Sequence, residues 1–354
     1  MRTLITGGAG FIGSTLAERL TEGGDEVVVL DDLTTGDRDN LDAVDPALLT
    51  FVEGSVLDEV LVDQLVGDCD RVFHLAAAVG VHNIVNEPLR SLRTNLHGTE
   101  IVLEACARAR LRVLIASTSE IYGKNDCDSL HEDADRIYGS PLLTRWSYAE
   151  AKALDEMVAH VYAETRGLEV VIIRPFNTVG PRQTGRYGMV LPNFVAQALR
   201  GDPITVYGDG AQSRCFQHVD DLVEGIIRLS EHPDAVGQPF NLGGPEEITI
   251  EGLARRIIEL SGSKSKIKRV PYSKAYAVGF DDMRRRVPDT SRARNLVGWG
   301  TTYTLDEIIL SVIEHKREAF ANVIDMPKRS ASGTPGSEAE PRRAGASRRV
   351  SEKI

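Results

Sequence analysis

Short apolar segments alternate with amphipathic segments through the first half of the chain. The apolar segments have the length of buried strands, and the longer segments between them place hydrophobic residues at helical spacing. Strands are predicted at residues 3–6, 26–30, 49–53, 71–75 and 112–117, and helices at residues 14–22 and 88–109. Because parallel strands need a crossover connection, this alternation predicts an α/β fold with a doubly wound parallel sheet.

A glycine-rich loop joins the first predicted strand to the first predicted helix. It reads GGAGFIG, and Gly7, Gly10 and Gly13 allow a tight turn, close approach of a pyrophosphate to the backbone and close packing of helix on strand. The second strand leads into Asp31, whose carboxylate can accept hydrogen bonds from an adenosine ribose and would repel a 2′-phosphate. These features predict a Rossmann-type domain that binds NAD rather than NADP.

Small residues follow the fourth predicted strand. The segment HLAAAVG places Leu75, Ala76 and Ala77 where a flat cofactor must pass close to the backbone. His74, at the end of the strand, is expected to pack or to form hydrogen bonds rather than to act in catalysis.

The pattern changes beyond Arg174. Loops rich in Gly, Pro, Asn and Arg are mixed there with predicted helices at residues 192–200 and 250–260. The final segment has few apolar side chains, so burial cannot offset the cost of ordering it. We expect a NAD-binding Rossmann domain at 1–174, to which residues of about 213–245 return, a smaller α/β substrate-binding domain at 175–320, and a disordered, passive tail at 326–354.

The composition restricts the function. The 354 residues include 41 Lys and Arg against 52 Asp and Glu, and the formal charge of -11 argues against a nucleic-acid binder. The four cysteines have no CxxC spacing, so neither a metal site nor a disulfide framework is expected. No apolar run approaches the ~18 residues that span a bilayer, and the first strand begins without a signal peptide. We expect a cytoplasmic protein that does not bind membranes.

The segment SYAEAK carries a candidate base. It places Tyr148 and Lys152 four residues apart at the predicted start of a helix, so both side chains point into the same space. For work near neutrality the pKa of a tyrosine must fall by about three units, which requires roughly 4 kcal/mol. A lysine ammonium, helped by the positive ring of an oxidised nicotinamide, is a source of that stabilisation.

Nine motifs occur in the order typical of one superfamily. They are GGAGFIG, LDDLTTG at 30–36, HLAAAVG, TNLHGT at 94–99, ASTSEIYG at 116–123, SYAEAK, RPFNTVGPR at 174–182, TVYGDGAQSRCF at 205–216 and RRRVPDTSRA at 284–293. Over residues 1–320 the chain resembles the extended short-chain dehydrogenase/reductase superfamily, in its NAD-dependent nucleotide-sugar epimerase, dehydratase and decarboxylase branch.

The resemblance implies roles for the matching residues. The implied cofactor residues are Gly7, Gly10, Phe11, Ile12 and Asp31 at the phosphates and adenosine ribose, Asp32 and Gly36 near that ribose, Leu75, Ala76 and Ala77 beside the cofactor, and Asn95 as a brace. Ser55 departs from the aspartate that members often have, although Val56 can still pack on the adenine. Tyr148 would be the base, Lys152 would bind the nicotinamide ribose and lower the pKa of Tyr148, and Thr118 would hydrogen-bond the reacting sugar hydroxyl.

A sugar-nucleotide site is implied in the second half. Arginines suit a diphosphate because the planar guanidinium donates two hydrogen bonds and stays charged. The implied substrate residues are Asn177, Arg214 and Arg286 at the diphosphate, Phe194 and Tyr207 at the uracil, and Arg186 at a sugar carboxylate.

Several reactions share the same first step. Tyr148 would remove the proton of the 4-hydroxyl while hydride passes to NAD, giving a 4-keto sugar. Ser119 stands where dTDP-glucose 4,6-dehydratases have an aspartic acid after the threonine, so a dehydratase is disfavoured. Ser119, Glu120 and Arg186 favour a UDP-hexuronate enzyme: UDP-glucuronate 4-epimerase first, UDP-glucuronate decarboxylase second, and UDP-glucose 4-epimerase third.

Two further expectations come by analogy. An NAD-sensing regulatory protein would typically have lost the Tyr148 and Lys152 pair or the diphosphate arginines, and this chain keeps them. Members of the superfamily commonly form homodimers through the helix that carries YxxxK, and an apolar stripe is present on that segment. The stripe consists of Ala151, Ala153, Leu154, Met157 and Val158, and burial in the core of a monomer would explain it equally well.

Overall fold

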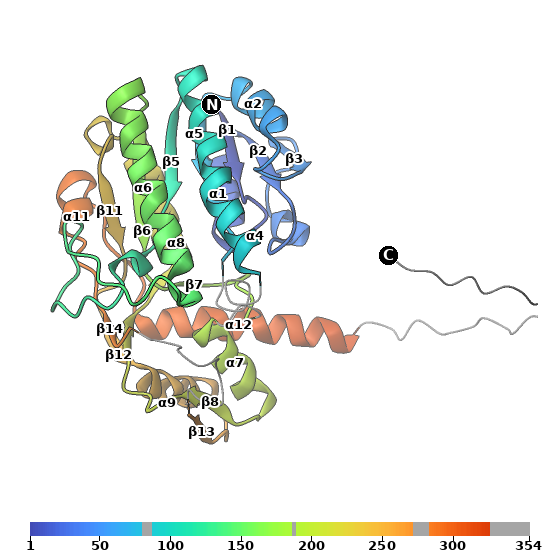
Figure 1. Cartoon of the computed structure of the whole chain (residues 1–354). Coiled ribbons are helices and arrows are strands. Elements are labelled where there is room, and N and C mark those ends of the chain that lie inside the picture. Colours follow the sequence, from blue (N-terminus) through green and yellow to red (C-terminus); the bar gives the residue numbers. More distant parts are fainter. Residues whose placement is uncertain (80–86, 186–188, 272–282, 326–354) are drawn as a thin grey trace, which may run out of the picture.

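A seven-stranded parallel sheet forms the centre of the structure, a computed structural model that describes residues 1–79, 87–185, 189–271 and 283–325 (Figure 1). Its strand order is β11-β6-β5-β4-β1-β2-β3. The strands are β1 (Arg2–Thr6), β2 (Glu26–Asp31), β3 (Leu49–Glu53), β4 (Arg71–His74), β5 (Arg112–Ala116), β6 (Val170–Pro175) and β11 (Pro239–Leu242). The predicted Rossmann-type doubly wound fold is confirmed.

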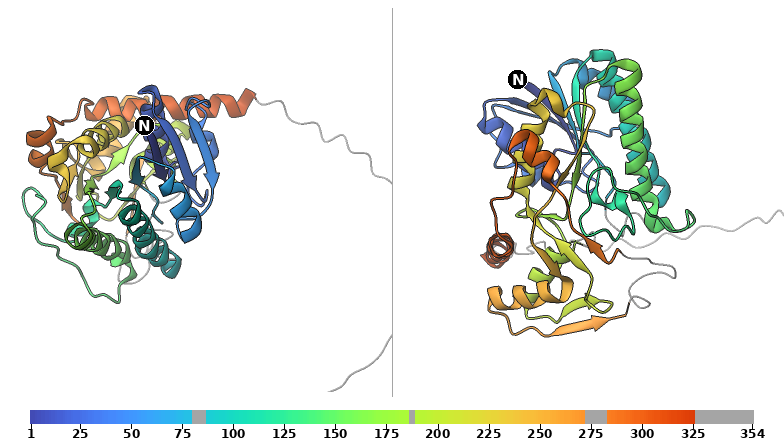
Figure 2. Two further views of the ribbon diagram at one scale, coloured as in Figure 1. Left: turned by 90° about the horizontal axis from the view of Figure 1, so that it is seen from above. Right: turned by 90° about the vertical axis from the view of Figure 1, so that its left-hand side faces the viewer.

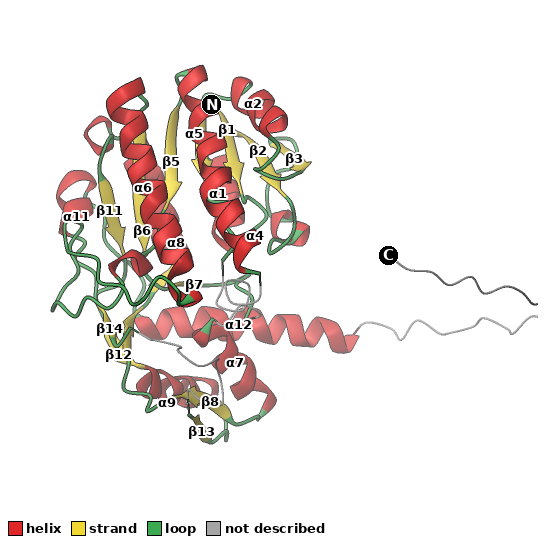
Figure 3. Ribbon diagram, viewed as in Figure 1, coloured by secondary structure: helices red, strands yellow, loops and turns green. Residues whose placement is uncertain are grey.

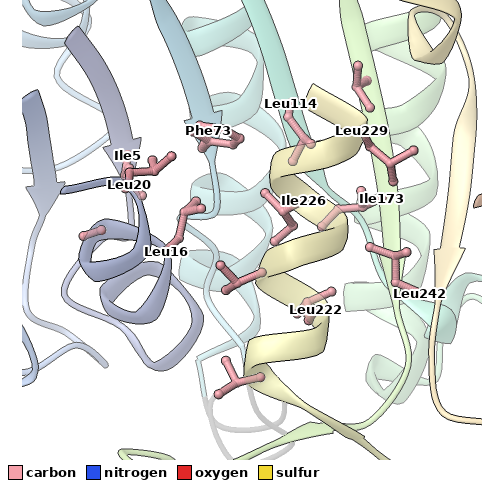
Figure 4. Close-up of a cluster of buried hydrophobic side chains, with 14 of the residues drawn as sticks. Ile5, Leu16, Leu20, Phe73, Leu114, Ile173, Leu222, Ile226, Leu229 and Leu242 are labelled. Atoms are coloured by element: carbon pink, nitrogen blue, oxygen red, sulfur yellow. The ribbon is translucent and has the colours of Figure 1, made fainter. Parts of the chain in front are cut away.

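Helices cover both faces of this sheet (Figure 2). The helices on one face are α1 (Phe11–Glu22), α8 (Val219–Glu231) and α11 (Ser291–Val297), and those on the other are α2 (Glu59–Gly67), α5 (Gly98–Ala109) and α6 (Ser147–Arg166). Successive strand residues point to opposite faces, so Ile5 packs under α1 and α8 while its neighbour Leu4 joins the other core. Figure 4 shows α8 laying Leu222, Ile226 and Leu229 on the sheet.

The strand order places a crevice at the carboxyl end of β1. β1 lies between β4 and β2. The chain continues from β4 to β5 on one side of β1, and from β2 to β3 on the other side. In open α/β sheets such a reversal leaves an opening in which ligands bind.

The predicted helix at residues 88–109 is divided into three parts. It begins as α4 (Pro88–Leu92), continues through a π-helical turn, η2 (Arg93–His97), and ends as α5. Asn95 lies in the wider turn, fully buried, where its side chain faces the strand-end loop. The helix is interrupted where Asn95 contacts that loop, and helical spacing in the sequence does not predict such a tertiary contact.

The second lobe has a core of its own below the carboxyl edge of the sheet (Figure 3). Its helices are α7 (Val190–Arg200), α9 (Ile250–Ser261) and α12 (Leu305–Asp325), and its strands are β7 (Thr178–Val179), β8 (Ile204–Tyr207), β9 (Ser213–Cys215), β10 (Gln217–His218), β12 (Glu247–Thr249), β13 (Ile267–Val270) and β14 (Arg285–Arg286). The chain crosses between the lobes repeatedly, since α8 packs on the main sheet and β11 pairs with β6.

Two sequence-based expectations fall outside the described residues, namely the disordered tail at 326–354 and the carboxylate-binding role of Arg186. Within the described ranges, no helix combines the length and the apolar character needed to cross a bilayer.

Candidate active site

One large cleft, of about 1640 Å³, lies at the carboxyl edge of the sheet and is lined by residues of both lobes. The glycine loop and the ends of β2 and β4 line one end of it, and residues of α7, β8, β9 and β14 line the other. A cleft of this size and position suits a dinucleotide together with a second ligand.

Two glycines of the loop, Gly7 and Gly13, have no room for a side chain. Gly7 has a φ of +73°, and a Cβ placed on it would lie 2.7 Å from the backbone nitrogen of Ala76. A Cβ on Gly13 would lie 2.3 Å from the carbonyl oxygen of Gly7. Gly10 is the N-cap residue of α1, so the first backbone N–H groups of that helix face the cleft as an anion site. Phe11 and Ile12, the first residues of α1, line the cleft beside it.

Replacing Gly7 with alanine should lower the free energy of unfolding by about 1–3 kcal/mol, because the new Cβ meets both an unfavourable φ and the Ala76 backbone. Thermal unfolding measures this loss. Gly24→Ala separates the two causes, since Gly24 has a φ of +85° but open space around it. An equal loss in both variants would contradict the proposed backbone contact.

Asp31 presents a fixed carboxylate at the end of β2. Its Oδ2 accepts a hydrogen bond from Ala9 N and its Oδ1 accepts one from Leu33 N, each at 2.9 Å. Burial raises the pKa of Asp31, and these two backbone N–H groups oppose the rise. Gly36 leaves space beside the carboxylate, because a Cβ there would lie 2.9 Å from Oδ1. Asp32 also lines the cleft and accepts a hydrogen bond from Thr34 N at 3.0 Å.

The other predicted cofactor residues divide into two groups. Those in the cleft wall are Val56, Leu75, Ala76 and Ala77. Ser55 is not among the lining residues, and its hydroxyl accepts a hydrogen bond from Leu57 N at 3.2 Å. Asn95 lies behind the wall and holds it, since its Oδ1 accepts a hydrogen bond from Ala78 N at 2.8 Å.

These surroundings fit NAD. The glycine loop provides a cradle in which a Cβ would collide with backbone, and Asp31 lies where a ribose diol would be recognised. The hydroxyl of Ser117 is buried in the wall and has no hydrogen-bond partner among the residues that the structure describes.

The reacting side chains gather after β5 and at the start of α6. Thr118, Ser119 and Glu120 open the short 3-10 turn η3 (Ser119–Tyr122), and Tyr148 lies on the first turn of α6. All four line the cleft. Burial raises the pKa of Tyr148, the charges of Glu120 and Asp155 raise it further, and a hydrogen bond with Thr118 opposes them.

Lys152 differs from the expectation. It is not among the cleft-lining residues, and its Nζ lies 3.0 Å from Oδ2 of Asp155, within α6. The lowering of the tyrosine pKa therefore stays a prediction for the protein with NAD bound. In the polypeptide by itself the ammonium is paired with a carboxylate, and the pKa of Tyr148 lies above its ordinary value.

Glu120 lies between two arginines at the middle of the cleft. Arg145 Nη1 is 2.8 Å from its Oε2, and Arg286 Nη1 is 3.9 Å from its Oε1. Burial alone would raise the pKa of Glu120, but the charges of Arg145 and Arg286 and the hydrogen bond from Arg145 hold it below its usual range. Arg286 Nη1 also donates to the hydroxyl of Ser119 at 3.3 Å. The result is a partly buried carboxylate whose pKa is held low by the arginines on either side of it.

Arg145 was not among the predicted site residues. It lies on η4 (Thr144–Trp146), the 3-10 turn immediately before α6, and its guanidinium is buried against Glu120. The sequence signal is the Arg145-Trp146 pair before Tyr148, which together with the Thr118–Glu120 triplet is similar to UDP-glucuronate decarboxylases, but this resemblance gives no direction for the arginine side chain.

The predicted substrate residues surround the far end of the cleft. Arg214 on β9 and Arg286 on β14 are on paired strands, which brings their guanidinium groups to the same side. Arg286 Nη2 donates to Oδ1 of Asn177 at 3.1 Å. Phe194 of α7 and Tyr207 at the end of β8 both line this end. Gln197, Thr205 and Gln212 line it as well and were not predicted.

Comparisons with known proteins agree with this geometry. The profile of the NAD dependent epimerase/dehydratase family matches residues 3–243. The chain is 38% identical over 318 residues to UDP-N-acetyl-alpha-D-glucosaminuronate decarboxylase of Bacillus cytotoxicus, covering 90% of this chain and 98% of that protein. It is 36% identical over 319 residues to UDP-glucuronic acid decarboxylase 1 of Xenopus tropicalis, covering 90% and 72%.

A solved structure shows the same fold. The UDP-glucose 4-epimerase of Thermotoga maritima, crystallised with UDP-glucose, matches with a TM-score of 0.82 at 30% identity and covers 90% of this chain and 100% of its own. The chain therefore belongs to the NAD dependent epimerase/dehydratase family of the extended short-chain dehydrogenase/reductase type, with NAD as its cofactor.

Proposed function

We propose that the chain decarboxylates a UDP-hexuronate, with UDP-glucuronate as the reference substrate. The observation that carries the proposal is the Glu120 carboxylate held between Arg145 and Arg286 in the cleft that also contains Tyr148. The curated relatives reported above are named decarboxylases, which favours the second of the sequence-based alternatives over the 4-epimerase placed first.

Oxidation at C4 prepares the substrate. NAD, when bound, supplies the hydride acceptor. Tyr148 receives the proton of the 4-hydroxyl, and Thr118, which hydrogen-bonds the phenol, orients it. The resulting ketone lies β to the C6 carboxylate, and this relation allows carbon dioxide to leave.

The charged cluster then determines the fate of the β-keto acid. The resemblance places Arg286 at the diphosphate, but its position beside Glu120 and Ser119 leads us to assign its positive charge to the sugar carboxylate instead, while Glu120 remains ionised and repels that carboxylate. Breaking the C5–C6 bond moves its electron pair into the ketone as an enolate, releases carbon dioxide and relieves that repulsion. The protonated Tyr148 and Thr118 can donate hydrogen bonds to the enolate oxygen, and a solvent water supplies the proton that is added at C5, which leaves a 4-keto pentose. Formation of UDP-xylose from that ketone would take back the hydride at C4 and the proton of Tyr148 at O4.

Incubation of the full-length protein with NAD and UDP-glucuronate, followed by NMR, tests the proposal. A 4-keto pentose or UDP-xylose with release of carbon dioxide is the expected product, whereas UDP-galacturonate would support the epimerase. UDP-N-acetylglucosaminuronate is assayed in parallel, because one relative is named for that substrate. If neither uronate is turned over, both readings fail and the NAD-sensing regulatory alternative gains support.

We also propose a homodimer formed through the outer face of α6. Leu154, Met157 and Val161 lie on this face at helical spacing and are 45%, 54% and 50% exposed, so burial within one chain does not explain them. The neighbouring Ala151 and Ala153 are buried. An apolar helix face of this kind is suited to packing against its own copy about a twofold axis.

Leu154→Glu should convert the dimer to a monomer, because each copy would place a charge in the shared apolar face. Light scattering coupled to size exclusion measures the change from twice the chain mass to 38.7 kDa. Leu310→Glu on α12 is the matched control, since Leu310 is 44% exposed in the second lobe. A monomeric parent protein, or a dimer retained by Leu154→Glu, would refute this interface.

A further inference from the structure

The Lys152–Asp155 pair is buried behind the active site. The two side chains are each 2% exposed, and Nζ and Oδ2 are 3.0 Å apart on adjacent turns of α6. A carboxylate three residues after the lysine of YxxxK has no role in the reaction proposed above. Burying a charged pair is costly unless hydrogen bonds satisfy it, so its presence next to the base needs a reason.

Two neutral side chains and the nearby charge of Glu156 complete the surroundings of this pair. Burial raises the pKa of Asp155, while the Lys152 ammonium and the hydroxyl of Thr99, from α5, oppose that rise by stabilising the charged form. The His74 ring, from β4, lies 3.1 Å from that hydroxyl through Nε2 and 2.8 Å from the Thr6 hydroxyl, on β1, through Nδ1. Burial and the charge of Lys152 lower the pKa of His74 to about 3, so the ring stays neutral. Because His74 is neutral, the positive charge next to Asp155 is that of Lys152, whose ammonium donates a hydrogen bond to the carboxylate.

The pair affects Tyr148, one turn earlier on the same helix. The charge of Asp155 is one of the causes that raise the pKa of Tyr148, together with burial and the charge of Glu120 from η3. Asp155 therefore acts twice against ionisation of the phenol: it binds the ammonium and it adds a negative charge nearby.

We infer that Asp155 is a positioning residue that holds the Lys152 ammonium away from Tyr148, so that the hydroxyls of the nicotinamide ribose must compete with this carboxylate for Lys152. NAD then binds less tightly than it would without Asp155, because moving the ammonium to the ribose leaves the buried Asp155 carboxylate without its partner. The base is activated only as cofactor binds, which keeps the phenol protonated otherwise. The inference requires NAD binding but not the identity of the sugar, so it stands apart from the proposed decarboxylation.

Calorimetric titration of the full-length protein with NAD tests the competition directly. Asp155→Asn should bind NAD about tenfold more tightly, since a hydrogen bond to a charged group no longer has to be exchanged. Glu164→Gln is the matched control, because it removes the same charge from an exposed position of α6 and should leave the affinity unchanged.

A double-mutant cycle identifies the group through which Asp155 acts. In a Lys152→Met background, Asp155→Asn should no longer alter NAD affinity, because there is no ammonium to release. On a turned-over substrate, Asp155→Asn should also move the rise of activity with pH to lower pH, since one of the charges opposing ionisation of Tyr148 is removed.

A merely structural Asp155 would give a different result. Asp155→Asn would then lower the unfolding temperature and leave NAD affinity equal or weaker, and either affinity outcome would overturn the inference. An effect that persists in the Lys152→Met background would do the same. If the asparagine variant does not fold, Asp155→Ser, which also removes the charge, is titrated in its place.

Discussion

Tyr148→Phe is expected to lower kcat on UDP-glucuronate by about 10³-fold, within the range measured for loss of a general base. The Tyr148 phenol, at the start of α6, lines the cleft and hydrogen-bonds Thr118. Phenylalanine keeps the aromatic ring but lacks the hydroxyl that would accept the substrate proton. Steady-state release of carbon dioxide measures the loss.

Binding measurements make this result specific. NAD affinity and the unfolding temperature of Tyr148→Phe should remain close to those of the parent protein, because the ring still fills its half-buried position in the cleft wall. Unchanged turnover in Tyr148→Phe would exclude Tyr148 as the base. Turnover lost together with NAD affinity would instead indicate a disturbed cofactor site.

Arg286→Met is expected to reduce kcat/KM for UDP-glucuronate by about 10²- to 10³-fold, the loss typical of removing one partner of a buried charge pair. Arg286 is 8% exposed and lies beside Glu120, Ser119 and Asn177, so its removal leaves the sugar carboxylate facing an ionised Glu120 with less opposing charge. The comparison substrate is UDP-glucose, which has no carboxylate: its binding should weaken less than that of UDP-glucuronate.

A neighbouring arginine provides the control. Arg284 precedes β14 by one residue, and its side chain is 82% exposed, so Arg284→Met removes the same charge outside the cleft. It should keep nearly full activity. Equal losses in Arg284→Met and Arg286→Met, or equal weakening of both sugars by Arg286→Met, would contradict a carboxylate role for Arg286.

The cofactor half was accessible from sequence because its signals are local. Gly7, Gly10 and Gly13 lie within seven residues, between a strand and a helix. Each glycine meets a steric requirement of the backbone, so the spacing alone predicts a dinucleotide-binding loop. Asp31 follows at the end of the next strand, whose parallel pairing with β1 brings it to the same edge. The parallel sheet itself followed from the alternation of short apolar and longer amphipathic segments.

The reaction centre depended on contacts between distant segments. Arg286 of β14 lies beside Glu120 of η3 although 166 positions separate them in the sequence, and no local pattern predicts that approach. The ion pair of Lys152 with Asp155 is local, yet helical spacing placed Lys152 near both Tyr148 and Asp155 and could not choose between them. The burial of both side chains favours the ion pair, because an ammonium without water around it is stabilised by a neighbouring carboxylate.

The sequence by itself thus indicated the family through the resemblance of nine ordered motifs. It also determined the cofactor loop and the elements that carry the site, because backbone turns, helix periodicity and strand length act over a few residues. Only the tertiary structure decided which polar and charged side chains pair. Arg145 pairs with Glu120, Arg286 donates to the Ser119 hydroxyl, and Lys152 pairs with Asp155. Charge interactions depend on separation and on exclusion of water, and both are properties of the packed chain.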